Sequence, residues 1–363
     1  MPRITKRAFL AGAAASAAFV TGGRAATPPV FAPEPGSWKR YQVTTTLQLA
    51  TPGSEAQAWI PLPGVTNADW VTPLGNHWTG KSFTAEQKDA GGAQLLHVVW
   101  NKGTQAPAIE VTSRFTTRDR AVDWNAPGKA VPLSEAAFKE YTGPTQYIPV
   151  TGQIKQLSDK ITSGASGDRA QVAAIYTWVV CNTYRDGKVK GCGTGNVAAM
   201  LKFADFGGKC ADLNGLFVGL VRAAGIPARD IYGIRVAPSA FGYHSLGANT
   251  PDITKSQHCR AEVYLADYGW VAMDPADVRK VMLEEVKAGL PMTDPKVMAA
   301  RQALFGGWDS NWMPYNHVND VALPGSAGRV LPFLMYPQAQ IDGVWQDPLS
   351  PATLQYSIHA EAI

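Results

Sequence analysis

The first third of the chain alternates short hydrophobic runs with turn-forming residues. The segment at 41–49 alternates apolar and polar side chains and is rich in β-branched residues, as a half-buried strand requires. Similar segments recur at 57–62, 95–100 and 109–115. Clusters of Pro, Gly, Asn and Asp separate them, and such residues favour turns. The pattern predicts an antiparallel β domain over residues 38–125.

Helical spacing begins after a proline-rich linker at 121–150. A helix is predicted over 169–180, with Asp168 at its N-terminus, where a carboxylate can cap the first turn. A second helix is predicted to start near Cys210 and to end before Gly225. It carries a continuous apolar stripe: Leu213, Leu216, Phe217, Leu220, Val221 and Ala224. The stripe should anchor this helix on a core while its first turn stays accessible.

Strands return after the second helix. Short β-rich segments occur at 231–236, 260–265 and 270–273, and the last two are close enough to form a hairpin. A helix is expected around 280–303. Two more short strands are expected near the end of the sequence: 330–335 and 354–359. Helices combined with antiparallel strands predict an α+β domain over residues 140–363, including a C-terminal extension.

The N-terminal residues follow the order of a secretory signal peptide. Its basic residues come first: Arg3, Lys6 and Arg7. An apolar run at 8–20 and small residues at 23–26 follow. The tract at 5–10 resembles a twin-arginine export signal with Lys in the first basic place. We therefore assign 1–26 to a signal peptide and the Pro-rich residues 27–37 to a tether, and expect a periplasmic or secreted protein.

Composition excludes several classes of protein. The 363 residues are 45% hydrophobic and 17% charged, whereas disordered chains, collagens and coiled coils are far more biased. No apolar run reaches the roughly 20 residues that a permanent membrane span needs. The formal net charge is +4, from 33 basic and 29 acidic residues. Four basic residues lie in the predicted signal peptide, so the mature chain carries 29 of each sign. This balance gives no reason to expect nucleic acid or an acidic substrate.

Cys210 stands where a reactive thiol is favoured. It is predicted to begin a helix, directly after Gly207, Gly208 and Lys209. The partial positive charge of a helix N-terminus stabilises a thiolate over a thiol. Glycines before it let a substrate backbone approach closely. Cys210 is therefore a candidate nucleophile.

His258 and a carboxylate come close together in the predicted hairpin. His258 precedes the strand at 260–265, and Asp274 follows the strand at 270–273. With a three-residue loop, Asp274 becomes the diagonal neighbour of His258, about 7–8 Å away at Cβ. With a two-residue loop, Asp277 lies opposite His258 instead. Either carboxylate could orient the imidazole by a hydrogen bond, so the spacing leaves two candidates.

The cysteine spacing gives little support for a metal. The chain has four cysteines and no Cys-x-x-Cys motif. A zinc site built from Cys181, Cys192, Cys210 and His258 would match no structural zinc pattern. No His-Glu-x-x-His motif is present. We therefore predict neither a metal nor a cofactor.

Three segments together resemble the transglutaminase-like superfamily. The run at 207–229 contains Gly-Gly-Lys-Cys-Ala-Asp and ends in Arg-Ala-Ala-Gly-Ile-Pro-Ala-Arg. The segment at 258–265 is similar to the family's histidine strand, and that at 269–275 to its aspartate strand. Matches in the region before the nucleophile are Trp178, Val179 and Tyr184. The resemblance covers about 165–280 and implies a papain-like core, in which the cysteine helix packs on an antiparallel sheet.

The resemblance implies a role for each matching residue. Cys210 is the nucleophile, and His258 is the general base and acid. Asp274, rather than Asp277, is the orienting carboxylate. The implied oxyanion donors are the backbone N–H of Cys210 and the hydroxyl of Tyr184.

Other positions receive a structural interpretation. Asp212 belongs to the motif and should tie the first helical turn to neighbouring backbone. The aromatic residue often found two positions after the histidine is Arg260 here, which bears on the acyl-acceptor side. The nucleophile itself must be free. Cys181 and Cys192 are eleven residues apart around a loop, so a disulfide between these two could form in an oxidising compartment. Cys259 is expected to be buried and reduced.

The resulting prediction is an exported thiol enzyme that transfers an acyl group from a protein or peptide. An envelope polymer is a further candidate substrate. Water as acceptor gives peptidase or amidase activity, which we favour, and an amine gives crosslinking. One alternative is a catalytically inactive module that binds protein or polymer on the same fold. Another is a metalloenzyme that uses His and Asp residues.

Overall fold

The computed structural model describes residues 30–50, 55–326 and 328–363. The predicted signal peptide and the first residues of the predicted tether lie outside these ranges. None of the helices within them combines the length and apolar character that crossing a bilayer requires. The fold is α+β, as the sequence pattern predicts.

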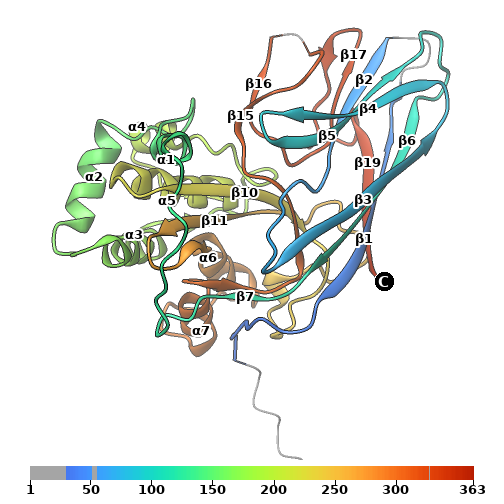
Figure 1. Cartoon of the computed structure of the whole chain (residues 1–363). Coiled ribbons are helices and arrows are strands. Elements are labelled where there is room, and N and C mark those ends of the chain that lie inside the picture. The colour runs from blue at the N-terminus through green and yellow to red at the C-terminus, as the bar shows by residue number, and fades with distance from the viewer. Residues whose placement is uncertain (1–29, 51–54, 327) are drawn as a thin grey trace, which may run out of the picture.

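Two antiparallel sheets form the β half of the molecule (Figure 1). Their strand orders are β19-β1-β6-β3 and β18-β17-β2-β5-β4. The bounds are β1 Lys39–Gln48, β2 Ala56–Pro61, β3 Val71–Gly80, β4 Phe83–Ala90, β5 Ala93–Trp100, β6 Ala108–Thr117, β17 Gln338–Ile341, β18 Val344–Trp345 and β19 Gln355–Ala362. Inward side chains of both sheets, such as Leu47 and Val98, share one hydrophobic core. All four strands predicted in this region are confirmed.

The sequence pattern does not predict strands β3 and β4, because both lie at sheet edges. In β3 only Val71 is buried, and a register shift follows Pro73. No residue of β4 is buried, and polar side chains dominate it. An edge strand with little buried surface needs no hydrophobic alternation, so the main sequence signal for a strand is missing.

The C-terminal strands return to the β half. β19 pairs antiparallel with β1, and β17 pairs antiparallel with β2. In Figure 1 the red β19 therefore runs beside the blue β1. The sequence pattern assigned these residues to a C-terminal extension of the 140–363 domain, whereas in space they complete sheets that the N-terminal strands begin.

The other half packs helices on a third antiparallel sheet of order β12-β11-β10-β14. The strands of this sheet are β10 Ala228–Arg235, β11 Gln257–Leu265, β12 Gly269–Met273 and β14 Trp312–Asn316. The helices are α1 Glu135–Thr142, α2 Gln153–Thr162, α3 Asp168–Asn182, α4 Val197–Phe203, α5 Cys210–Ala223, α6 Pro275–Glu284, α7 Pro295–Ala303 and the 3-10 turn His244–Leu246. Short paired strands complete the fold: β7 Arg120–Ala121 with β13 Gly307–Trp308, β8 Tyr184–Arg185 with β9 Gly207–Gly208, and β15 Asn319–Ala322 with β16 Val330–Phe333.

Helix α5 is the centre of this half (Figure 1). It packs against β10 and β11 on one side and against α2 and α3 on the other. All 14 of its residues are buried. The helix is therefore buried on every side and not only along the predicted apolar stripe. Its first turn, which was expected to stay accessible, is buried as well.

Three local expectations can be compared with the structure. The hairpin loop has three residues, since Leu265 pairs with Gly269, which is the alternative that favours Asp274. The single helix around 280–303 is wrong, because α6 and α7 are separated by a segment that contains Gly289 at φ 73°. The linker at 121–150 is not wholly irregular, since it contains α1.

Asp230 on β10 makes the stability of this half depend on pH. Its side chain is 1% exposed, and neither carboxylate oxygen has a hydrogen-bond partner within the described residues. Burial raises its pKa from 3.8 to about 7, although the nearby Arg222 opposes the shift. Because the folded state holds the proton more tightly, ionisation should cost stability as pH rises from about 4 to about 7.

We expect Asp230→Asn to be more stable than the unmodified protein at pH 8, by at most about 4 kcal/mol. The difference should disappear near pH 3, where Asp230 is neutral in both the folded and the unfolded state. Urea unfolding at both pH values measures it, with Asp267→Asn at an exposed position as the control. A difference that is equal at both pH values would show that ionisation of Asp230 is not its cause.

Candidate active site

Cys210 is the first residue of α5, and its position depends on Asp212. The backbone N–H of Lys209 donates to Asp212 Oδ2 at 3.0 Å. The backbone N–H groups of Thr194 and Gly195 donate to Asp212 Oδ1 at 3.0 and 2.9 Å. One buried carboxylate therefore joins the start of the helix to the preceding loop. This geometry agrees with the structural interpretation of Asp212.

Two glycines leave room for that carboxylate. A Cβ at Gly193 would lie 1.8 Å from Asp212 Oδ2, and one at Gly208 would lie 2.5 Å from Asp212 Cβ. Gly193 also has φ 93°, which side-chain-bearing residues rarely adopt. The Gly-rich sequence around Cys210 thus has a packing reason of its own.

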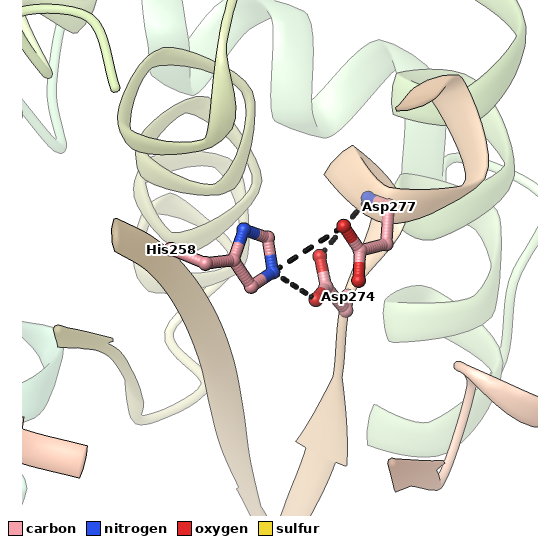
Figure 2. Close-up of side chains that lie close together, drawn as sticks. All are labelled: His258, Asp274 and Asp277. Atoms are coloured by element: carbon pink, nitrogen blue, oxygen red, sulfur yellow. Dashed lines mark hydrogen bonds and ion pairs between the residues drawn. The ribbon is translucent and has the colours of Figure 1, made fainter. Parts of the chain in front are cut away.

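His258 on β11 is held by the carboxylate that follows β12. His258 Nε2 lies 2.7 Å from Asp274 Oδ2, and both side chains are buried (Figure 2). Asp274 is also the N-cap of α6, where its Oδ1 accepts from the backbone N–H of Asp277 at 3.1 Å. With Nε2 facing the carboxylates, Nδ1 is the ring nitrogen on the opposite side of the imidazole (Figure 2).

Asp277 lies beside this pair but has a different principal partner. Its Oδ1 is 3.4 Å from His258 Nε2. Both of its oxygens accept from Arg235 Nη2, at 2.7 and 2.6 Å. The two carboxylates that sequence spacing left as alternatives therefore both approach the histidine, and Asp274 is the closer.

The charges of this cluster shift its pKa values in opposite directions. Burial and Arg235 lower the pKa of His258, but Asp277 and Asp274 outweigh them and raise it above its ordinary value. Burial and the charge of Asp277 raise the pKa of Asp274. Burial acts in the same direction on Asp277, but Arg235 outweighs it and lowers the pKa of Asp277. The arrangement favours a charged imidazole between a shared set of carboxylates.

Two polar residues, Asn214 and Arg260, support Asp274 through contacts that the sequence analysis did not predict. Asn214 Nδ2 donates to Asp274 Oδ1 at 3.1 Å and to the carbonyl of Cys259 at 3.0 Å. Its signal was present, because a polar residue four positions after Cys210 interrupts an apolar helix. Arg260 Nε lies 4.0 Å from Asp274 Oδ2, and its guanidinium also pairs with Asp309. No local pattern predicts this pairing, since Asp309 comes from a distant segment.

Three thiols gather at the start of α5. Cys210 Sγ lies 3.7 Å from Cys259 Sγ, so the nucleophile candidate touches the neighbour of His258. Cys192 Sγ donates to the carbonyl of Gln257 at 3.2 Å. Hydrogen bonds from Cys210 and Cys259 lower the pKa of Cys192, whereas burial raises the pKa of Cys259. The cluster can thus stabilise one thiolate among three neighbouring sulfurs.

The remaining cysteine lies apart from the cluster. Cys181 is exposed, and all four cysteines, which belong to the described residues, have free thiols. A bond between Cys181 and Cys192 is therefore not formed in this structure. Cys259 is buried, as expected.

His258, Asp274 and Asp277 also have the composition of a metal site. Their ligand atoms lie within 4.8 Å of one another. However, Arg235 engages both oxygens of Asp277, and Asn214 occupies Asp274 Oδ1. A guanidinium already supplies the positive charge that a cation would bring. The geometry is therefore better suited to orienting the imidazole than to binding a metal.

Tyr184 is not brought to Cys210 in the way that the resemblance implies. Its ring covers Gly207, and its hydroxyl donates to Asp205 Oδ1 at 2.8 Å. The side chain is about half exposed and does not border the cavity that contains Cys210. Tyr336 does border that cavity, and its hydroxyl oxygen accepts from the backbone N–H of Cys192 at 2.9 Å. A phenol near the thiols therefore comes from the C-terminal part of the chain.

Cys210 and His258 open onto one cavity of about 1100 Å³. Its walls come from both halves of the molecule, including Thr46 of β1 and Tyr356 of β19. The β half thus borders the candidate active site, although sequence analysis found no chemistry in it. Both candidate reacting residues therefore border the same space.

Comparison with known proteins identifies a family that matches the part of the chain containing this site. Residues 155–275 match the model of the transglutaminase-like superfamily, a range that contains Cys210, His258 and Asp274. An uncharacterized protein of Haemophilus influenzae is 36% identical over 330 residues, which are 85% of this chain and 87% of that protein.

Solved structures were also compared, and one of them shares the fold. A candidate cysteine protease from Cytophaga hutchinsonii has a TM-score of 0.53 at 13% identity, covering 90% of this chain and 99% of its own. The periplasmic domain of TgpA from Pseudomonas aeruginosa has a TM-score of 0.34 at 15% identity, covering 69% of this chain and 93% of its own. At 13% identity, the similarity to the Cytophaga hutchinsonii structure supports a shared fold and nothing further.

Proposed function

Because this chain belongs to the transglutaminase-like superfamily, we propose that it is a thiol acyl-transfer enzyme acting on carboxamide or peptide bonds. The observation that carries the proposal is the arrangement around the cavity. Cys210 begins a buried helix, and His258, held by Asp274, opens onto the same space. A thiol at a helix N-terminus and an oriented imidazole are the two groups that nucleophilic catalysis needs.

The reaction follows from these groups. The Cys210 thiolate attacks the carbonyl carbon, and a C–S bond forms as the carbonyl oxygen gains negative charge. The backbone N–H of Cys210, at the positive end of α5, is placed to stabilise that oxygen. His258 gives its proton to the leaving amine, the C–N bond breaks, and a thioester remains on Cys210.

The second half of the reaction depends on the acceptor. Water attacks the thioester while His258 accepts a proton, which releases a carboxylate and the free thiol. An amine in place of water would give a new amide and therefore a crosslink. We propose hydrolysis as the principal outcome, on a protein or peptide substrate. The segment 1–26 further supports export, so we place this activity in the periplasm or outside the cell.

Alkylation tests the proposal without knowledge of the substrate. We expect iodoacetamide at pH 7 to modify Cys210 faster than Cys192 or Cys259, and His258→Ala to slow this reaction about tenfold or more. Intact mass and peptide mapping measure the rate at each thiol, with the exposed Cys181 as the internal reference. Equal Cys210 rates in both proteins would contradict an imidazole-activated thiol, as would preferential labelling of Cys192.

A further inference from the structure

The cavity at Cys210 has walls of two different kinds. One wall is largely apolar and comes from the C-terminal segment: Pro348, Leu349, Pro351, Leu354 and Tyr356. Other segments of the lining carry basic side chains: Arg185, Lys188, Lys190, Lys209, Arg235, Lys255 and Lys280. Among the described residues of this lining, Glu284 is the only one with a carboxylate. A chain of balanced overall charge therefore has a strongly basic active-site cavity.

Most of this positive charge is not neutralised within the protein. Arg185 pairs with Glu284, and Lys280 lies 3.8 Å from the same carboxylate, so two cations share one anion. The other four lysines form no ion pair within the described part of the chain: Lys188, Lys190, Lys209 and Lys255. Like charges around one concave space raise its potential, because the low-dielectric walls focus the field.

Three of the lining lysines are near neighbours of the thiols and of His258 in the sequence. Lys209 directly precedes Cys210, Lys190 precedes Cys192 by two residues, and Lys255 precedes His258 by three. Gln257 borders the same cavity, and its buried Nε2 has no hydrogen-bond partner within the described residues. An amide donor beside several ammonium groups suits carboxylate oxygens. Solubility alone would scatter lysines over convex surfaces, whereas these lysines line one cavity.

We infer that the acyl donor is an acidic peptide, whose carboxylates on either side of the reacting carbonyl bind Lys188, Lys190, Lys209 and Lys255. This inference rests on the proposed function for the position of the reacting carbonyl. Carboxylates are preferred to phosphates because the lining offers separate lysines, with its two arginines already paired to Glu284 and Asp277. The apolar wall suits aliphatic or aromatic side chains of the same peptide.

Binding to an inactive variant tests the inference. Full-length Cys210→Ala would be titrated with a dye-labelled heptapeptide that has Gln at its centre and Glu on both sides. The reference is the same peptide with Gln in place of each Glu. We expect the Glu peptide to bind about tenfold more tightly at low salt, and the preference to shrink as salt rises. In a Lys188→Gln, Lys190→Gln, Lys255→Gln background the preference should be lost.

A matched triple variant controls for net charge. Lys81, Lys102 and Lys160 are exposed and do not border the cavity, so their replacement by Gln should preserve the preference. Equal affinity for the two peptides, or equal loss in both triple variants, would overturn the inference. Tighter binding of a peptide with phosphoserine in place of Glu would contradict the assignment to carboxylates.

The binding measurement is independent of catalysis. If the Glu peptide binds selectively but the active protein turns over no peptide, the acidic-peptide site stands and the proposed function fails. If the protein cleaves neutral peptides at the same rate as acidic ones, and the lysine variants also cleave both at equal rates, the inference is wrong. The proposed enzymatic function would then still stand.

Discussion

Replacing Cys210 with serine is expected to lower turnover by about 10⁴-fold or more while the protein remains folded. The serine hydroxyl does not ionise near neutral pH, so the acyl-enzyme cannot form at a useful rate. The change removes no ion pair and adds no volume to the core. Release of ammonia from carbobenzyloxy-Gln-Gly and of soluble dye from labelled casein would measure activity. Thermal unfolding would show that the fold is retained.

The neighbouring thiols provide the controls for this result. Cys181→Ser, at an exposed position, should leave both activity and unfolding temperature unchanged. Cys259→Ser removes the sulfur 3.7 Å from Cys210 Sγ, and we expect it to retain at least about a tenth of the activity. An inactive Cys192→Ser together with an active Cys210→Ser would assign the nucleophile to Cys192 instead.

Replacing Asp277 with asparagine is expected to cost about 3–5 kcal/mol of the free energy of unfolding. Both of its oxygens accept from Arg235, whose side chain is 2% exposed and whose Nε has no partner within the described residues. The substitution would leave a buried guanidinium without its counter-ion. Urea denaturation at pH 7 measures the loss.

Asp274→Asn is the matched comparison, because it alters the other carboxylate beside His258. Asparagine can still cap α6, and the Arg235–Asp277 pair stays intact, so we expect a smaller loss of stability. Activity should fall by about 10³-fold, because an amide no longer stabilises the charged imidazole or fixes its tautomer. If Asp277→Asn instead lost activity without stability, and Asp274→Asn did the reverse, the two roles would be exchanged.

The sequence alone was enough to predict several strands, the helix that begins at Cys210 and the candidate catalytic residues. Strand alternation in β1, β2, β5 and β6, and the helical stripe after Cys210, were visible because each element buries one recurring set of side chains. The hairpin that brings Asp274 toward His258 was narrowed to two registers by loop length alone. Such features are local, so residue spacing is enough to find them.

Contacts between segments that lie far apart in the sequence could not be predicted from residue spacing. Asn214 and Arg260 support Asp274 through contacts with other elements, and Tyr336 reaches the thiols from the C-terminal part of the chain. The pairing of β19 with β1 joins residues more than 300 positions apart. No periodicity records such a pairing, because its partners are chosen by the shape of the assembled core.

The formal net charge of +4, from 33 basic and 29 acidic residues, shows the same division. The sequence determined the total charge of the chain and the position of Cys210, His258 and Asp274 along it. Only the tertiary structure placed Lys188, Lys190 and Lys255 around one cavity and enclosed α5 on all sides. Net charge is a sum over residues, whereas a substrate responds to the field at one place, and that field depends on where folding brings each charge.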